Sequence, residues 1–317
     1  MRLYSLYYNF KGFIPRRLQI VLRRALVWCK HGFYNRRWPI ALSAGRRPPE
    51  FPGWPEGKRF ALVLRHDVEC DLGRDKCDRI LDLERPFALK SAFFLVPEGY
   101  AVPRELRDRI QAAGGEVGVH GLKHDGKLYS SRSWFSTRAV RINRYLREWG
   151  AVGFASPSAH HELDWLHELE IEFDSSTFDT DPFEPQPDAT HTIYPFVVQG
   201  PPGQRDFIEL PYTLPQDFTL LILMKQTDIS LWKRKLDWIA SCGGMALLNT
   251  HPDYMRFRGE KADCYTYPAR LYNDFLEYVV KRYAGQYWNV PPREVASYWR
   301  SLGAPGADSN NSPPNKS

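Results

Sequence analysis

The chain of 317 residues has no long apolar run, which excludes a simple membrane-spanning helix. One of its longer runs, residues 220–224, is far shorter than the roughly 20 residues that such a helix needs. Near the start, arginines at 16, 17, 23 and 24 interrupt the apolar residues, so we expect no signal peptide there. The sequence therefore predicts a cytoplasmic location, with the inner face of the membrane as an alternative.

Cysteine is scarce, and its spacing excludes a zinc-thiolate site. The chain has five cysteines, an odd number, and none lies in a close CxxC pair. We therefore expect free thiols in a reducing compartment.

Acidic residues are absent from the first 49 positions. This segment holds 11 of the 43 Lys and Arg residues and none of the 37 Asp and Glu residues, so the rest of the chain carries a net charge of −5. The positive balance is thus a property of one segment, which argues against a nucleic-acid-binding surface on the body and for a basic element that meets an anionic partner.

A basic amphipathic helix is predicted within residues 14–30. Apolar residues recur there at helical spacing, namely Leu18, Val21, Leu22, Ala25, Leu26 and Cys29, and arginines follow on the other side. Two interpretations stay open. The apolar face caps the domain and leaves the arginines in water, or the helix makes peripheral contact with a membrane surface.

Beyond a Pro- and Gly-rich linker at 45–58, strand and helix patterns alternate. Candidate strands lie at 60–66, 91–96, 116–119, 152–155, 171–174, 207–210 and 245–249, and candidate helices at 103–113, 133–149, 229–241 and 268–284. Seven strands interleaved with helices predict an α/β fold with a mostly parallel sheet, closed or nearly closed into a barrel. We expect three parts: the basic helix and linker at 1–57, the barrel at 58–302 and a disordered tail at 303–317. A Pro- and Asp-rich excursion at 179–206 breaks the alternation.

Chemically active side chains gather where the predicted strands end. Asp67 and Glu69 follow the first strand, His120 and His124 follow the third, and His251 follows the last. Carboxyl ends of parallel strands share one rim, so these groups predict a hydrolytic metal site there. If a helix begins at His120, positions four apart share a face, and two neutral imidazoles with one carboxylate leave a metal an open position.

With these pieces placed, the chain resembles the polysaccharide deacetylase family, the NodB-homology domain of carbohydrate esterase family 4. The resemblance covers about residues 58–255 and extends to Trp288-Asn289-Val290-Pro291. It implies a distorted (β/α)7 barrel, here preceded by the basic amphipathic helix. It also implies a divalent metal, for which we expect Zn²⁺, and an N-acetylated saccharide as substrate.

The motifs assign roles by resemblance. Asp67 matches the general base, Glu69, His120 and His124 the metal ligands, and His251 the histidine that protonates the leaving amine. Glu69 stands where the family has Asp, and the extra methylene moves the carboxylate by over ~1 Å, so Asp67 or Asp71 remains an alternative ligand.

Two further motif positions bear on the site. Ala155 in Gly153-Phe154-Ala155-Ser156-Pro157 stands where the family has an arginine that orients the base. The segment Phe173-Asp174-Ser175-Ser176 resembles the one that supports the catalytic histidine.

The resemblance therefore implies a metal-dependent hydrolase that removes an acetyl group from an N-acetylated sugar of a glycan or glycolipid precursor. Ala155 and Glu69 motivate an alternative, a catalytically impaired glycan-binding protein. A third possibility is a deformylase or another C–N hydrolase that uses the same atoms.

Overall fold

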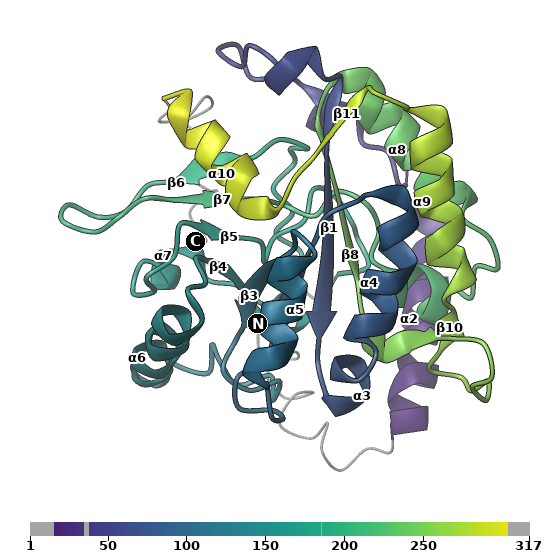
Figure 1. Ribbon diagram of the computed structural model, residues 1–317, viewed down its shortest axis with the longest axis horizontal. Coiled ribbons are helices and arrows are strands. Elements are labelled where there is room, and N and C mark those ends of the chain that lie inside the picture. Colours follow the sequence, from purple (N-terminus) through teal and green to yellow (C-terminus); the bar gives the residue numbers. More distant parts are fainter. Residues whose placement is uncertain (1–15, 35–37, 185, 304–317) are drawn as a thin grey trace.

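The computed structural model describes residues 16–34, 38–184 and 186–303. Its centre is a curled, mostly parallel sheet whose strands alternate with helices on the outside (Figure 1). The strands are β1 (Phe60–Val68), β2 (Ser91–Leu95), β3 (Glu116–His120), β4 (Gly153–Ala155), β5 (Phe173–Asp174), β6 (Phe196–Val198), β7 (Phe207–Glu209), β8 (Met245–Thr250) and β11 (Tyr287–Asn289). A separate pair consists of β9 (Met255–Arg256) and β10 (Tyr267–Pro268).

The helices lie between and around these strands. They are α2 (Arg16–Tyr34), α3 (Asp71–Arg74), α4 (Cys77–Glu84), α5 (Arg104–Ala112), α6 (Arg132–Trp149), α7 (Leu163–Leu166), α8 (Ser230–Cys242), α9 (Arg270–Arg282) and α10 (Pro292–Ser301). Local signals set their ends. In α6, for example, the Ser131 side chain accepts a hydrogen bond from the Trp134 amide, and Gly150, at φ +61°, ends the helix.

The strand order confirms the barrel predicted from the sequence. The sheet runs β8-β1-β2-β3-β4-β5-β7-β6, with β11 beside the first half of β1 and only β6 antiparallel to its neighbour. The seven predicted strands correspond to β1, β2, β3, β4, β5, β7 and β8. Within the described part of the chain, no regular ladder joins β7 to β8. The barrel is closed there by hydrogen bonds between Thr213 and the backbone of Met245 and Leu247.

Strand β1 forms the axis of the fold. All nine of its residues are buried, and it pairs in parallel with β8 on one edge and with β2 and β11 on the other. Such two-sided burial explains the near-continuous apolar run Phe60–Leu64. The run also makes the polar residues that follow it, Arg65 to Asp67, conspicuous.

Helix α2 reverses one sequence-based expectation. Leu18, Val21, Leu22 and Leu26, expected to pack inward if the helix capped the domain, are 49%, 57%, 46% and 64% exposed. The helix is instead held by Ile20 and Val27, which are buried. The capping interpretation is therefore wrong for this apolar face.

The predicted C-terminal tail cannot be compared with the structure over most of its length. The tail expected at 303–317 lies outside the described residues except for Gly303.

The five cysteines, all described, are free, as expected. Among the described helices, none has both the length and the apolar character required to cross a membrane.

Candidate active site

The site is built on the carboxyl end of β1, where successive side chains point to opposite faces. His66 faces the outer helices, and its ring nitrogens contact the Thr250 hydroxyl and the Glu84 carboxylate at 2.8 and 2.9 Å. Arg65 and Asp67 have the opposite parity and therefore face the inside of the barrel. His66 therefore packs between the sheet and the helices, and its two neighbours are the residues that face the candidate site.

The Asp67 carboxylate, the predicted base, is held by a guanidinium and an amide. Arg65 donates from Nε to Oδ1 at 2.8 Å, and the Asn249 side chain donates to Oδ2 at 2.9 Å. Arg65 is fixed in turn by the Ser175 hydroxyl at 2.9 Å. Burial alone would raise the pKa of Asp67, but Arg65 and then His120 hold it well below its usual range, so the carboxylate stays ionised.

Arg65 supplies the guanidinium that Ala155 cannot provide. The sequence predicts that the base lacks an orienting arginine, because Ala155 carries no guanidinium. In the structure the guanidinium comes from β1 itself. The predicted base is therefore oriented, by a residue two positions before it.

The Glu69 carboxylate lies between two histidines just beyond the end of β1. Its Oε1 is 3.1 Å from Nε2 of His124 and 3.9 Å from Nε2 of His251, and its Oε2 accepts a hydrogen bond from the Tyr254 hydroxyl at 2.6 Å. Burial would raise the pKa of Glu69, but the neighbouring His124 and His251 hold it well below the usual value.

The backbone that carries Glu69 is anchored by Asp253. The Asp253 carboxylate accepts hydrogen bonds from the amides of Glu69 and Cys70, both at 2.9 Å. Close approach at this point requires Gly73, because a Cβ there would lie 2.3 Å from Oδ2 of Asp253. Asp71, the alternative ligand, is exposed, and it accepts a hydrogen bond from the Leu72 amide at the start of α3.

His120 and His124 do not share a helical face, so that expectation is wrong. Strand β3 ends at His120, and Gly121 then adopts φ +63°, which turns the chain into a loop. The two rings nevertheless stack, with centroids 5.6 Å apart. A loop therefore achieves the proximity that a helical turn was expected to provide.

The orientation of His120 is set by the backbone of Ala155. Nδ1 of His120 lies 3.0 Å from the Ala155 carbonyl oxygen, so Nδ1 carries the proton and Nε2 keeps its lone pair. Burial lowers the pKa of His120 to about 4. A neutral imidazole with a free lone pair is the form that binds a metal.

His251 has a different partner and, unlike the neutral His120, carries a positive charge. Its Nδ1 lies 2.6 Å from Oδ1 of Asp217, whose Oδ2 accepts hydrogen bonds from the His251 amide and the Tyr267 hydroxyl, both at 2.8 Å. Burial would lower the pKa of His251, but Asp217, then Glu69 and Asp67, raise it to about 10. The imidazolium is therefore retained at neutral pH.

The segment Phe173–Ser176 does not take the supporting role that its resemblance implies. Ser175 contacts Arg65, and the Ser176 hydroxyl accepts a hydrogen bond from the Ser156 amide at 2.8 Å. The carboxylate that supports His251 is Asp217, which precedes the π-helical turn η6 (Phe218–Leu223).

The five predicted residues meet at one rim, in two groups. Asp67 and His120 approach to 4.0 Å, and Glu69 joins His124 and His251. Among the described residues, no three His, Cys, Asp or Glu side chains converge closely enough to form a ready metal cage. The donor set still fits a divalent ion in its chemistry, since it offers a carboxylate, a neutral imidazole with a free Nε2 and a second imidazole.

Four residues of the site were missed in the sequence: Arg65, Asn249, Asp217 and Tyr254. Arg65 had a signal, because a charged residue in an apolar strand with the same parity as Asp67 predicts a shared face. Asn249 had one too, two residues before His251. Asp217 and Tyr254 had no such signal, because each lies far in the sequence from the side chain that it contacts, His251 and Glu69 respectively.

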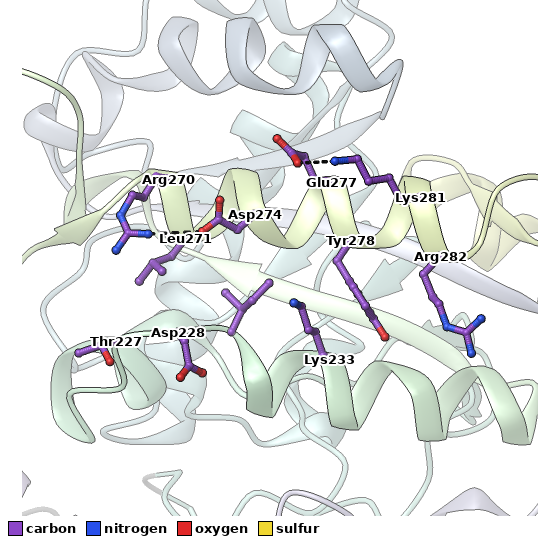
Figure 2. A pocket seen from close by; sticks show the side chains of 11 residues that line it. Thr227, Asp228, Lys233, Arg270, Leu271, Asp274, Glu277, Tyr278, Lys281 and Arg282 are labelled. Atoms are coloured by element: carbon purple, nitrogen blue, oxygen red, sulfur yellow. Dashed lines mark hydrogen bonds and ion pairs between the residues drawn. The ribbon is translucent and has the colours of Figure 1, made fainter.

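A groove of about 670 Å³ lies elsewhere, between α8 and α9 on the outside of the barrel (Figure 2). Its charged residues pair along α9, with Lys281 bound to Glu277 and Arg270 to Asp274. None of the candidate site residues lines it, so we do not assign the chemistry there.

Comparison with solved structures places the fold. A Mycobacterium smegmatis protein assigned as a polysaccharide deacetylase superposes with a TM-score of 0.62 at 18% identity, over 81% of this chain and 96% of that one. A Pseudomonas aeruginosa PAO1 protein with the same assignment and the allantoinase Puue each give a TM-score of 0.60, at 16% and 17% identity, over 83% of this chain and 98% of theirs.

Comparisons at the level of sequence gave nothing further. A scan against protein-family models found no match, and neither did a search of curated proteins. The likeness is thus one of structure. The chain has the polysaccharide-deacetylase fold, as its resemblance to that family implied.

Proposed function

We propose that this protein is a hydrolase that removes the acetyl group from an N-acetylated sugar of a glycan or glycolipid precursor, with a divalent metal, expected to be Zn²⁺. One observation carries the proposal. A single rim of the barrel joins an ionised carboxylate, Asp67, an imidazolium, His251, and a donor set of Glu69, His120 and His124. Titratable groups whose surroundings push their pKa values apart are typical of an acid–base pair.

The two pKa shifts suit amide hydrolysis. An amide has a poor leaving group, so the departing amine needs a proton, and His251 holds one on Nε2 at neutral pH. Asp67 is ionised and is the acceptor for a proton from the attacking water. Arg65 and Asn249 fix its two oxygens, so the carboxylate needs no reorientation. A divalent ion held by Glu69, His120 and His124 would supply Lewis acidity toward the acetyl carbonyl.

The similar folds support this class of reaction. Two of the solved structures are assigned as polysaccharide deacetylases. The third is an allantoinase, which favours keeping other C–N bonds, including a formyl amide, as substrates to be tested. These likenesses concern the fold, so activity in this chain is inferred from its own residues.

The Arg65–Asp67 pair favours one second candidate. A carboxylate whose pKa is held far below neutrality is a weak base. A glycan-binding protein with impaired turnover needs no strong base at Asp67, whereas an efficient hydrolase needs Asp67 to take a proton from the attacking water.

The test is acetate release from chitin oligosaccharides by protein reconstituted with Zn²⁺, with formylated sugars and allantoin as parallel substrates. Asp67→Asn and His251→Gln should each lose about 10²–10⁴-fold in rate. The matched control is His191→Asn, an exposed histidine outside the site. Oligosaccharide binding without acetate release would favour the binding protein, and turnover that survives both substitutions would overturn the proposed roles.

A further inference from the structure

Helix α2 lies on the body with its apolar side outward, the reverse of an ordinary surface helix. The exposed side carries Leu18, Val21, Leu22 and Leu26, and Trp28 beside them is 80% exposed. We call these five residues the outer face of α2. Large apolar side chains gathered on one helix face mark an interaction surface more often than isolated ones do.

The reversed orientation is fixed by specific contacts of the basic side chains. Arg24 donates from Nε to the Ile222 carbonyl and from Nη2 to the Cys264 carbonyl, both at 3.0 Å. Lys30 donates to the Pro182 carbonyl at 2.8 Å. Rotating the helix to bury its leucines would break these hydrogen bonds.

Helix α2 lies next to the candidate site through its inner side. Arg23 stacks on Phe218 at 4.7 Å, and the Phe218 ring lies 4.9 Å from that of Tyr254. Tyr254 holds Glu69, and Phe218 directly follows Asp217. A partner bound to the outer face is therefore separated from the candidate rim by the helix itself and by these few side chains.

Charge distinguishes between partners for this face. Residues 1–49 carry 11 basic and no acidic side chains. A second copy docked through α2 would bring two such segments together, and they would repel each other. An anionic lipid surface offers apolar depth for the leucines and negative headgroups for the positive charge of the segment 1–49, and it is complementary in both respects.

We propose that α2 is a peripheral membrane-binding helix, whose outer face inserts into the surface of an anionic lipid bilayer. The helix lies in the plane of the bilayer surface, in keeping with an amphipathic segment too basic to cross it. This docking does not depend on the proposed hydrolase activity. It places the candidate site beside the membrane, whichever reaction takes place there.

The test is co-sedimentation of the full chain with vesicles of phosphatidylcholine containing phosphatidylglycerol, and with vesicles of phosphatidylcholine alone. We expect binding to the anionic vesicles that weakens as salt is raised, since salt screens the headgroup attraction. The double variant Leu22→Gln/Leu26→Gln should bind at least about tenfold more weakly, because it removes two apolar side chains from the insertion. Both residues are exposed, so its unfolding temperature should match that of wild type.

Val140→Gln is the matched control, because Val140 is 71% exposed on another helix, α6. Its vesicle binding should equal that of wild type. The proposal is overturned if wild type binds neither vesicle, or if the control loses as much binding as the double variant. A wild-type dimer that the double variant dissociates, without vesicle binding, would overturn it in favour of a second copy.

Discussion

Arg65 and Asp67 lie two residues apart on β1 and form a buried, two-point ion pair, with Nε–Oδ1 and Nη2–Oδ2 distances of 2.8 and 2.5 Å. Their side chains are only 3% and 4% exposed. A strand places residues two apart on the same face, so the pairing follows from the backbone of β1 alone. The candidate base is thus built together with the residue that orients it.

We predict that Arg65→Met destabilises the fold strongly, because it leaves the Asp67 carboxylate buried without a counter-charge. Breaking a buried pair in this way costs about 3–5 kcal/mol. Urea unfolding at neutral pH measures the loss. Arg65→Met/Asp67→Leu should recover much of it, since no charge is then left unpaired.

The same pair predicts a pH dependence. The pKa of Asp67 is lowered in the folded state. The stabilising contribution of Asp67 is therefore present above its unfolded pKa of about 4 and is lost as the pH falls from there toward the folded pKa. The difference between wild type and Arg65→Met should therefore shrink in acid. An equal difference at all pH values would contradict the ion pair.

His251 should remain protonated at neutral pH because of Asp217. In an NMR titration of the metal-free protein, His251 should titrate near pH 10, and in Asp217→Asn its pKa should drop, because the main cause of the raised pKa is then removed. His191→Asn should leave the His251 titration unchanged. A His251 that titrates near its ordinary value in wild type would remove the basis for its role as an acid.

The pH dependence of the stability contribution of His251 runs opposite to that of Asp67. The folded pKa of His251 lies above the unfolded value of about 6.5. Its contribution is therefore fully present below pH ~6.5 and is lost as pH rises toward 10. Urea unfolding across this range, compared with Asp217→Asn, measures it.

Gly73→Ala should disturb the site, although Gly73 makes no contact through a side chain. The added methyl would lie 2.3 Å from Oδ2 of Asp253, which anchors the amides of Glu69 and Cys70. Overpacking of this kind costs about 1–3 kcal/mol. Gly32→Ala, in α2 with no heavy atom within 4 Å of the new methyl, should instead stabilise by about 0.5–1 kcal/mol. Equal effects of the two changes in thermal unfolding would contradict the role of Gly73.

Tyr254→Phe should weaken metal binding if Glu69 is a ligand, because the Tyr254 hydroxyl orients the Glu69 carboxylate. Loss of such an outer partner reduces metal affinity by about 10–100-fold. Competition with a zinc chelator gives the affinity. Tyr278→Phe, in the outer groove of Figure 2, is the control and should bind like wild type. Unchanged affinity in Tyr254→Phe would shift the metal away from Glu69.

The barrel could be predicted because each strand is short, apolar and bounded by polar or turn residues. Phe60–Leu64 and Met245–Leu248 are such runs, and both became central strands. The orientation of α2 could not be predicted, because helical spacing defines two faces but not which of them packs inward. Hydrogen bonds from Arg24 and Lys30 to distant carbonyls decide it.

The site was predictable where its residues end strands and not where they meet across the fold. His120 and His251 follow apolar runs and were found, although the helical turn expected after His120 is a loop. Asp217 is 34 residues from His251, and nothing in its local sequence marks it. A pairing of this kind exists only once β8 and the turn η6 are packed together.

The two-sided pairing of β1 has a consequence for amide hydrogen exchange. Over the second half of the strand its amides lie in a ladder with β2 and β8, whose residues are all buried, so local opening there is strongly disfavoured. They should exchange only when the whole domain unfolds, and the positions of Arg65 and Asp67 should be among the slowest in the protein. Glu69, one residue beyond the strand, lies outside this ladder, and its amide is bonded to the Asp253 carboxylate instead. The predicted base is thus held by the sheet itself, whereas Glu69 is held by contacts with the turn after β8, and its amide should exchange independently.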